Sequence, residues 1–169
     1  MVLHCNAETI RFEYGETRKP YLGYSYGTTL SFNLADAADE MLIAIGNHPD
    51  LGVDVELSTG TRNFANAIES SLSESGLEHL RAIGRLPREG VLLRYWSHKE
   101  ALPEIVRYLS CSFPLSDVRV NLIDEVGSIM RACTGQLEIT LHGREIDCRA
   151  DHVASLAADP AAPITQFQV

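Results

Sequence analysis

The chain has 169 residues, of which 45% are apolar and 22% charged, the balance of an ordinary globular protein long enough to bury one core. Its net charge of −9 disfavours binding to nucleic acid or anionic membranes, because such binders need a basic surface that neutralises phosphates. The longest apolar run, Met41–Ile45, is too short to cross a bilayer, and the N-terminus lacks the features of a secretory signal, so we expect a cytoplasmic protein.

The cysteines and histidines show no spacing typical of a metal site. The four cysteines are scattered and form no Cys-x-x-Cys pair, which favours reduced thiols over a zinc site. The histidines lie far apart in sequence and also lack ligand spacing. His98, which falls within a predicted helix, is expected on the surface of that helix.

The N-terminal third of the chain is predicted to form short strands. Apolar residues alternate there with polar ones, and β-branched and aromatic residues are frequent. The expected strands are Thr9–Tyr14, Thr28–Asn33, Met41–Ile45 and Leu51–Glu56.

Helical signals occupy the middle of the chain. Ser73 is a suitable N-cap for a helix at Gly76–Ile83. The strongest helix is predicted at Arg88–Leu102, whose apolar residues have broadly helical spacing. Pro103 lacks a backbone donor and should kink or restart this helix, with Glu104–Leu109 as its continuation.

Strand-like segments return in the C-terminal third. They are expected at Asp117–Ile123, Gln136–Leu141, Glu145–Ala150 and His152–Ala157, and residues 158–169 are expected to form a mobile tail. Strands followed by helices and then strands again predict an α+β fold with a mostly antiparallel sheet.

A first candidate site lies in the sequence Gly-Val-Asp-Val-Glu at positions 52–56. Residues two apart on a strand share a face, so Asp54 and Glu56 should project together while Val53 and Val55 face the core. Two carboxylates on a rigid strand suit Mg²⁺, which takes one or two carboxylates together with waters and substrate phosphate oxygens. Alone, such a pair is more often a solvated face than a metal site.

A second candidate is the sequence Trp-Ser-His-Lys-Glu-Ala at positions 96–101, on the long predicted helix. Alone, a Lys-Glu pair on a helix is usually solvated, and Trp96 is more often a core anchor than a stacking platform. The two motifs together, however, resemble the signature of the 4′-phosphopantetheinyl transferase superfamily. Their separation resembles the larger, surfactin-synthetase-activating type.

Shorter segments follow the order of the same family. They are Arg18-Lys19-Pro20-Tyr21, Phe32-Asn33-Leu34, Leu72-Ser73 and Phe113-Pro114-Leu115, so the resemblance extends from about Lys19 to Val120. It implies the family's α+β architecture of two related halves, each with a small antiparallel sheet and a packed helix. We expect one domain over residues 1–157, with a shortened first half at 1–56 and a second half at 57–157.

The resemblance also implies a reaction and the residues that perform it. Asp54, Glu56 and Glu100 would hold Mg²⁺ against the pyrophosphate of coenzyme A, and Lys99 would neutralise charge on the phosphoryl oxygens. Lys19 would contact a coenzyme A phosphate. The 4′-phosphopantetheine group would then be transferred to a serine of an acyl or peptidyl carrier protein, with Glu100 helping to deprotonate that serine.

Several positions depart from the family pattern. Asp36 stands where the family has a histidine that contacts a coenzyme A phosphate, and Glu104 replaces a lysine. Gly76 falls where the family has a glutamate. Two acids near the phosphate positions predict that coenzyme A binds more weakly than in an intact family member.

Three interpretations remain open from the sequence. The first is an active transferase that binds its coenzyme A donor in an altered way. The second is a catalytically degenerate homologue that acts as a binding or structural subunit, and the third is an unrelated Mg²⁺ phosphotransferase. The shortened first half could leave apolar residues exposed, which makes a homo-oligomer plausible.

Overall fold

The computed structural model describes residues 5–14, 20–23, 26–28, 30–47, 51–58, 68–70, 72, 74–83, 88–108, 118–122, 127–134, 137–159 and 165. Among these residues, four strands precede β5, and they form two antiparallel pairs. The first pair is β1 (Phe12–Tyr14) with β2 (Pro20–Leu22), and the second is β3 (Ser31–Ala37) with β4 (Glu40–Gly46). The remaining elements are β5 (Leu51–Leu57), α2 (Glu74–Ile83), α3 (Arg88–Tyr108), β6 (Val118–Leu122), β7 (Gly127–Thr134), β8 (Leu137–Ile146) and β9 (His152–Ala158). A single 3₁₀ turn, η1, covers Ala7–Thr9.

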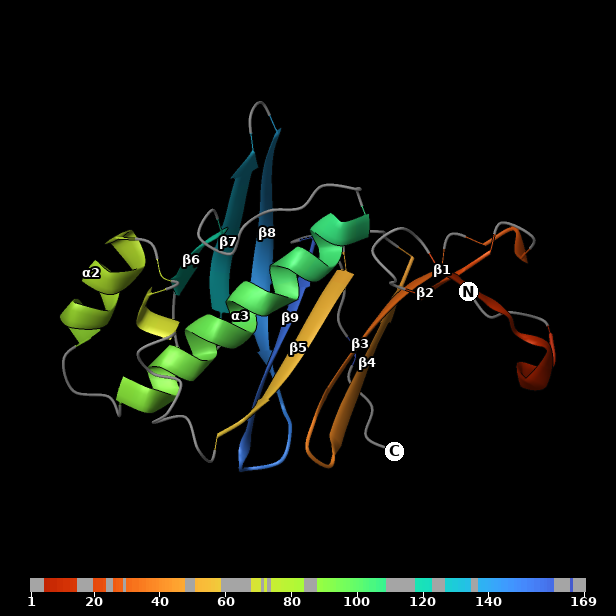
Figure 1. Cartoon of the computed structure of the whole chain (residues 1–169), viewed down its shortest axis with the longest axis horizontal. Helices are drawn as coiled ribbons and strands as arrows, with labels where there is room; N and C mark the ends of the chain where they lie inside the picture. Colours follow the sequence, from red (N-terminus) through yellow and green to blue (C-terminus); the bar gives the residue numbers. More distant parts are fainter. Residues whose placement is uncertain are drawn as a thin grey trace.

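The centre of the fold is an antiparallel five-stranded sheet with the order β5-β9-β8-β7-β6. Helix α3 lies diagonally across one face of this sheet, and α2 lies beside β6 (Figure 1). β5 is joined to the sheet through β9, in a register that pairs Leu51 with Ala158 and Leu57 with His152. The first strand after the hairpin therefore belongs to the same sheet as the C-terminal strands.

The hydrophobic core fills the space between α3 and the sheet. Tyr95, Ala101 and Leu102 of α3 are fully buried, as is Met130 of β7. The other buried members of this cluster are Val91, Val118, Val120, Leu122, Leu141 and Ala157. Burial of each large apolar side chain contributes about 1.5–3 kcal/mol, so this layer holds the helix in one position on the sheet.

The β3–β4 hairpin lies beside β5 and is attached by polar contacts to β5 and to residues at or just before the start of β9. The Val53 backbone N–H donates to the Asn33 side-chain oxygen at 2.5 Å, so an amide side chain takes the place of a neighbouring strand at this point. At the hairpin turn, Asp39 forms an ion pair with Arg149, and the Ala37 carbonyl lies 3.1 Å from Nε2 of His152.

The structure confirms most of the predicted elements, but β2 (Pro20–Leu22) was not among them. Three further corrections concern the five-stranded sheet and α3. The first correction is that β7 was not predicted. Its buried residues include the polar Ser128, whereas the apolar Ile129 is partly exposed, so its sequence does not alternate clearly between apolar and polar residues. Two strands predicted around residues 136–150 are wrong as separate elements, because β8 runs unbroken from Leu137 to Ile146.

Gly143 explains why β8 continues where a break was predicted. A Cβ atom at this position would overlap Ser128 Oγ and the His98 ring, so glycine allows a close approach within the strand. The third correction concerns Pro103, because α3 is assigned as one helix from Arg88 to Tyr108 and does not restart at the proline. Ala101 and Leu102, which precede the proline, are fully buried in the core between α3 and the sheet.

None of the helices in the described part of the chain is both long enough and apolar enough to span a bilayer. The predicted tail begins one residue early, because Ala158 is the last residue of β9, and most of residues 159–169 lie outside the described residues. Cys5 and Cys148 are free thiols, as expected.

Candidate functional site

Strand β5 carries the first motif as the alternation predicted. Val53 and Val55 are buried, whereas Asp54 and Glu56 are partly exposed. The face of β5 that bears the two carboxylates is turned toward α3, because Glu56 and the backbone of Asp54 both contact residues of that helix. The strand thus presents two oxygen-rich side chains in the layer between sheet and helix.

Helix α3 brings the second motif against the first. The indole N–H of Trp96 donates to Oε1 of Glu56 at 2.7 Å, and the Ser97 hydroxyl donates to the Asp54 backbone carbonyl at 3.4 Å. Two motifs that lie 40 residues apart in sequence are therefore in direct contact.

Glu100 lies on the same side of α3 as these contacts. It follows Trp96 by four residues and Ser97 by three, and residues at these spacings are neighbours on one helix face. Its side chain is partly exposed. Within the described residues, however, no three His, Cys, Asp or Glu side chains stand close enough together to hold one metal ion. A three-carboxylate site at Asp54, Glu56 and Glu100 therefore remains a prediction.

The electrostatics of this layer are those of a partly desolvated site. Burial raises the pKa of the Glu56 carboxyl, and the hydrogen bond from Trp96 offsets part of that increase. Lys99 is only 1% exposed, and burial lowers the pKa of its ammonium group to about 8. Because both groups are partly desolvated, a charge placed beside either of them would shift its pKa strongly.

The prediction that His98 lies on the helix surface is wrong. Its side chain is fully buried between α3 and the sheet, and its Nδ1 lies 3.0 Å from the Ser128 hydroxyl of β7. Burial, together with the nearby Arg94 charge, lowers the pKa of His98 to about 4. His98 is therefore neutral near pH 7 and belongs to the packing that fixes α3 on the sheet.

The residues predicted at or near the coenzyme A phosphates are only partly described by the structure. Lys19 lies outside the described residues, and so does the side chain of Glu104, although its backbone belongs to α3. Asp36 is exposed on β3, opposite Met41 of β4, and Gly76 is buried in α2. The phosphate-binding part of the predicted site is thus not tested.

Trp96 is a functional candidate whose contact the sequence did not predict. It was expected to be a core anchor, but it is only partly buried and its indole N–H binds a predicted metal ligand. A usable signal was its spacing of four residues from Glu100, which places both on the helix face that meets β5.

The chain is similar in sequence to proteins named as 4′-phosphopantetheinyl transferases. It is 27% identical over 93 residues to the 4′-phosphopantetheinyl transferase HetI of Nostoc sp., a match that covers 54% of this chain and 39% of that protein. It is 32% identical over 92 residues to the 4′-phosphopantetheinyl transferase AcpT of Salmonella typhi, covering 53% of this chain and 45% of the relative. The chain therefore spans less than half the length of these curated relatives. No protein-family model matches it.

These similarities confirm the resemblance predicted from the two motifs. The mixed α/β architecture with antiparallel sheets is compatible with that resemblance, and the division into two related halves remains a prediction.

Proposed function

We propose that this chain is a cytoplasmic, Mg²⁺-dependent 4′-phosphopantetheinyl transferase. Its donor substrate is coenzyme A, and its acceptor is a serine of an acyl or peptidyl carrier protein. The observation that carries the proposal is the hydrogen bond between Trp96 and Glu56, because it joins the two motifs by which the chain resembles this superfamily. The similarity to two proteins named as such transferases supports the same reaction.

The donor groups of the site fit a hard divalent cation. Asp54, Glu56 and Glu100 offer only carboxylate oxygens, the ligands that Mg²⁺ prefers. The partly desolvated Glu56 carboxylate would also be stabilised by a cation, because burial alone raises its pKa. When bound, Mg²⁺ supplies electrostatic stabilisation of the phosphate oxygens.

The residues of the chain then catalyse a single displacement at the β-phosphorus of coenzyme A. Glu100 accepts the proton of the carrier-protein serine, whose oxygen forms a bond to the β-phosphorus of coenzyme A. The bond from that phosphorus to the bridging oxygen breaks, and 3′,5′-adenosine bisphosphate leaves with the electron pair. Lys99 neutralises charge on the transferring group, and Lys19 binds a phosphate of the donor.

Intact-protein mass spectrometry tests this function directly. The chain is incubated with coenzyme A, Mg²⁺ and a panel of apo acyl and peptidyl carrier proteins. We expect one carrier protein to gain the mass of one phosphopantetheine group. Glu100→Ala should lower the rate by about a hundredfold or more, because it removes both a proton acceptor and a metal ligand. Glu138→Ala, which removes an exposed carboxylate of β8, serves as the matched control.

The proposal is overturned if no carrier protein is modified, or if Glu100→Ala transfers as fast as the unaltered chain. A complete absence of transfer would favour the alternative of a catalytically degenerate homologue that acts as a binding or structural subunit. Asp36→His combined with Glu104→Lys then distinguishes lost activity from an unrelated role, because it restores the family residues at the two acidic departures.

The metal can be tested without any carrier protein. Trp96 is the only tryptophan of the chain, and its indole N–H binds Glu56. We expect Mg²⁺ to change the tryptophan fluorescence in a saturable manner. Glu56→Gln keeps an oxygen that can accept the indole bond but removes the charge, so it should abolish the response. A response of unchanged size in Glu56→Gln would assign the metal to another site.

A further inference from the structure

The large apolar side chains that are exposed in the described part of the chain all belong to the N-terminal strands. They are between 46% and 67% exposed, and none lies on the five-stranded sheet or on a helix. They are Phe12 and Tyr14 of β1, Leu34 of β3, and Met41, Ile43 and Ile45 of β4.

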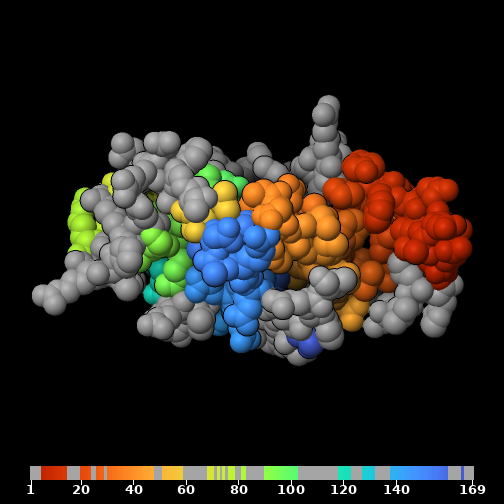
Figure 2. Space-filling view, turned by 90° about the horizontal axis from the view of Figure 1, so that it is seen from below, coloured from red at the N-terminus to blue at the C-terminus, as the bar shows by residue number. Residues whose placement is uncertain are grey.

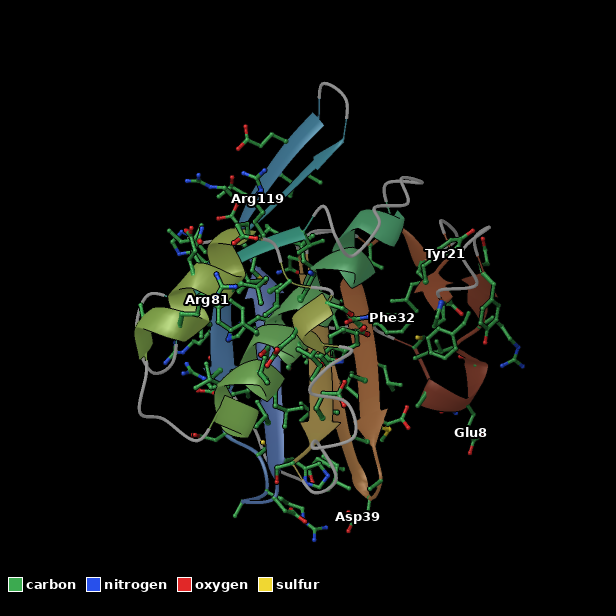
Figure 3. The ribbon with its side chains drawn as sticks, turned by 60° about the vertical axis from the view of Figure 1, so that its left-hand side comes forward. Glu8, Tyr21, Phe32, Asp39, Arg81 and Arg119 are labelled. Carbon is green, nitrogen blue, oxygen red and sulfur yellow. The ribbon has the colours of Figure 1, made fainter. Side chains whose placement is uncertain are left out.

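These side chains form one continuous surface. The register of the hairpin places Leu34 opposite Ile43 and Phe32 opposite Ile45, so their side chains share a face. The ring of Phe12 lies 5.4 Å from that of Phe32, which joins β1 to the hairpin. We call these seven residues the apolar face. Figure 2 shows β3 and β4, in orange, beside the red N-terminal segment on one side of the molecule, and Figure 3 shows Phe32 at the end of the hairpin remote from Asp39.

The area of the apolar face is that of a protein interface. A large apolar side chain offers on the order of 200 Å² when fully open, so the six exposed side chains together present roughly 700 Å². The largest apolar patch on a typical monomer is about 300–600 Å². Each partner in a stable complex buries about 800 Å², so the apolar face nearly suffices as one side of such a contact.

The near absence of charge on the apolar face favours contact with a second copy of the same chain. Among the outward positions of β3 and β4, only Asp36 carries a charge, and it lies toward the turn. Apart from Asp36, the outward positions of β3 and β4 therefore offer no charge that would attract a charged partner. Two copies that each carry a net charge of −9 repel one another least when they meet through their least charged surface.

We propose that the chain forms a symmetric homodimer in which the apolar faces of two copies pack against each other. In a two-fold arrangement the same patch is used on both copies, and a flat apolar sheet face is complementary to itself. The two hairpins stack as sheets about 10 Å apart, with their aliphatic and aromatic side chains forming a shared core. This inference rests on the side chains of the hairpin and not on the α3–β5 layer. The same outward face carries Asp36, the position at which the resemblance implies a contact with a coenzyme A phosphate.

The oligomeric state of the full chain tests the proposal. Sedimentation equilibrium and light scattering should show a mass twice that of the 18.6 kDa chain at micromolar concentration. Ile45→Lys, at a side chain that is 65% exposed, should weaken dimerisation by at least about tenfold, because it places two like charges in the apolar contact. Thr140→Lys makes the same change of charge at an exposed strand position of β8 and should leave the dimer intact.

Circular dichroism confirms that both variants remain folded. The proposal is overturned if the unaltered chain is monomeric at concentrations of tens of micromolar, which would leave the face to a different partner. It is also overturned if Ile45→Lys and Thr140→Lys form dimers of equal strength, because the dimer would then use another surface.

Discussion

Apolar side chains are buried between α3 and the five-stranded sheet but exposed on the β3–β4 hairpin. Between α3 and the five-stranded sheet, Tyr95, Leu102 and Met130 are fully buried against one another. On the β3–β4 hairpin, Ile43 and Ile45 point outward and are more than half exposed. The sheet and α3 therefore have a core of their own, whereas the hairpin depends on polar attachments to β5 and β9 and on whatever covers its outer face.

The largest expected effect comes from removing the same kind of side chain on the two sides. Leu102→Ala leaves a cavity in the buried layer and should lower the free energy of unfolding by about 2–5 kcal/mol. Ile45→Ala should change it by no more than about 0.5 kcal/mol in the monomer. Urea denaturation at low protein concentration measures both, and equal losses would contradict the contrast between the two regions.

The buried histidine predicts acid sensitivity of the α3–sheet layer. The pKa of His98 is lowered from 6.5 to about 4, so between these values the unfolded chain binds the proton and the native protein does not. Stability from this group is therefore present above pH 6.5 and lost as pH falls toward 4, by up to about 3 kcal/mol. His98→Gln should flatten this part of the profile of unfolding free energy against pH. A profile of unchanged slope would show that the pKa of His98 is the same in the native and unfolded states.

A pair of glycine substitutions examines how closely α3 approaches the sheet. Gly143→Ala should cost about 1–3 kcal/mol, because the new methyl group would overlap Ser128 and His98. Gly90→Ala, at a position of α3 where a Cβ meets nothing, should instead stabilise the protein by about 0.5–1 kcal/mol. Thermal unfolding of the two variants should therefore shift in opposite directions, and a neutral Gly143→Ala would mean that the contact is looser than described.

The attachment of the hairpin should respond to pH in the sense opposite to the core, and with a smaller effect. Both ring nitrogens of His152 face acceptors, Asp151 Oδ1 at 2.9 Å and the Ala37 carbonyl at 3.1 Å, so only the protonated ring can donate to both. Burial acts to lower the pKa of His152, but the bonds to Asp151 and Ala37 outweigh it, and Asp151 and Glu40 add favourable charge. The net result is a raised pKa.

This contribution to stability is full below the ordinary pKa of about 6.5 and is lost as pH rises through the raised value. The difference in unfolding free energy between the unaltered chain and His152→Gln should accordingly shrink as pH increases from 6 to about 9. Arg149, which lies beside Asp151 and binds Asp39, stays charged throughout this range. A difference that grows with pH would contradict the assignment of a doubly donating ring.

The alternation of residues along the strands predicted which side chains share a face but not which face is covered. It placed Asp54 and Glu56 together, and their contact with α3 followed from the resemblance of two motifs. On β4 both sides are apolar, so the outward exposure of Met41, Ile43 and Ile45 could not be derived from the pattern. The burial of His98 depends on Gly143, which lies 45 positions further along the chain and only becomes its neighbour in the folded sheet.

The pairing of β5 with β9 also has a consequence for the order of folding. These strands join residues 51–57 to residues 152–158, so their contact closes a loop of roughly a hundred residues. Contacts of such sequence separation form slowly, whereas the β3–β4 hairpin closes through two residues and can form early. During synthesis, the strand that carries Asp54 and Glu56 has no neighbour on its β9 side until the C-terminal strand has emerged. The candidate site is therefore completed among the last steps of folding, after its own residues have long been available.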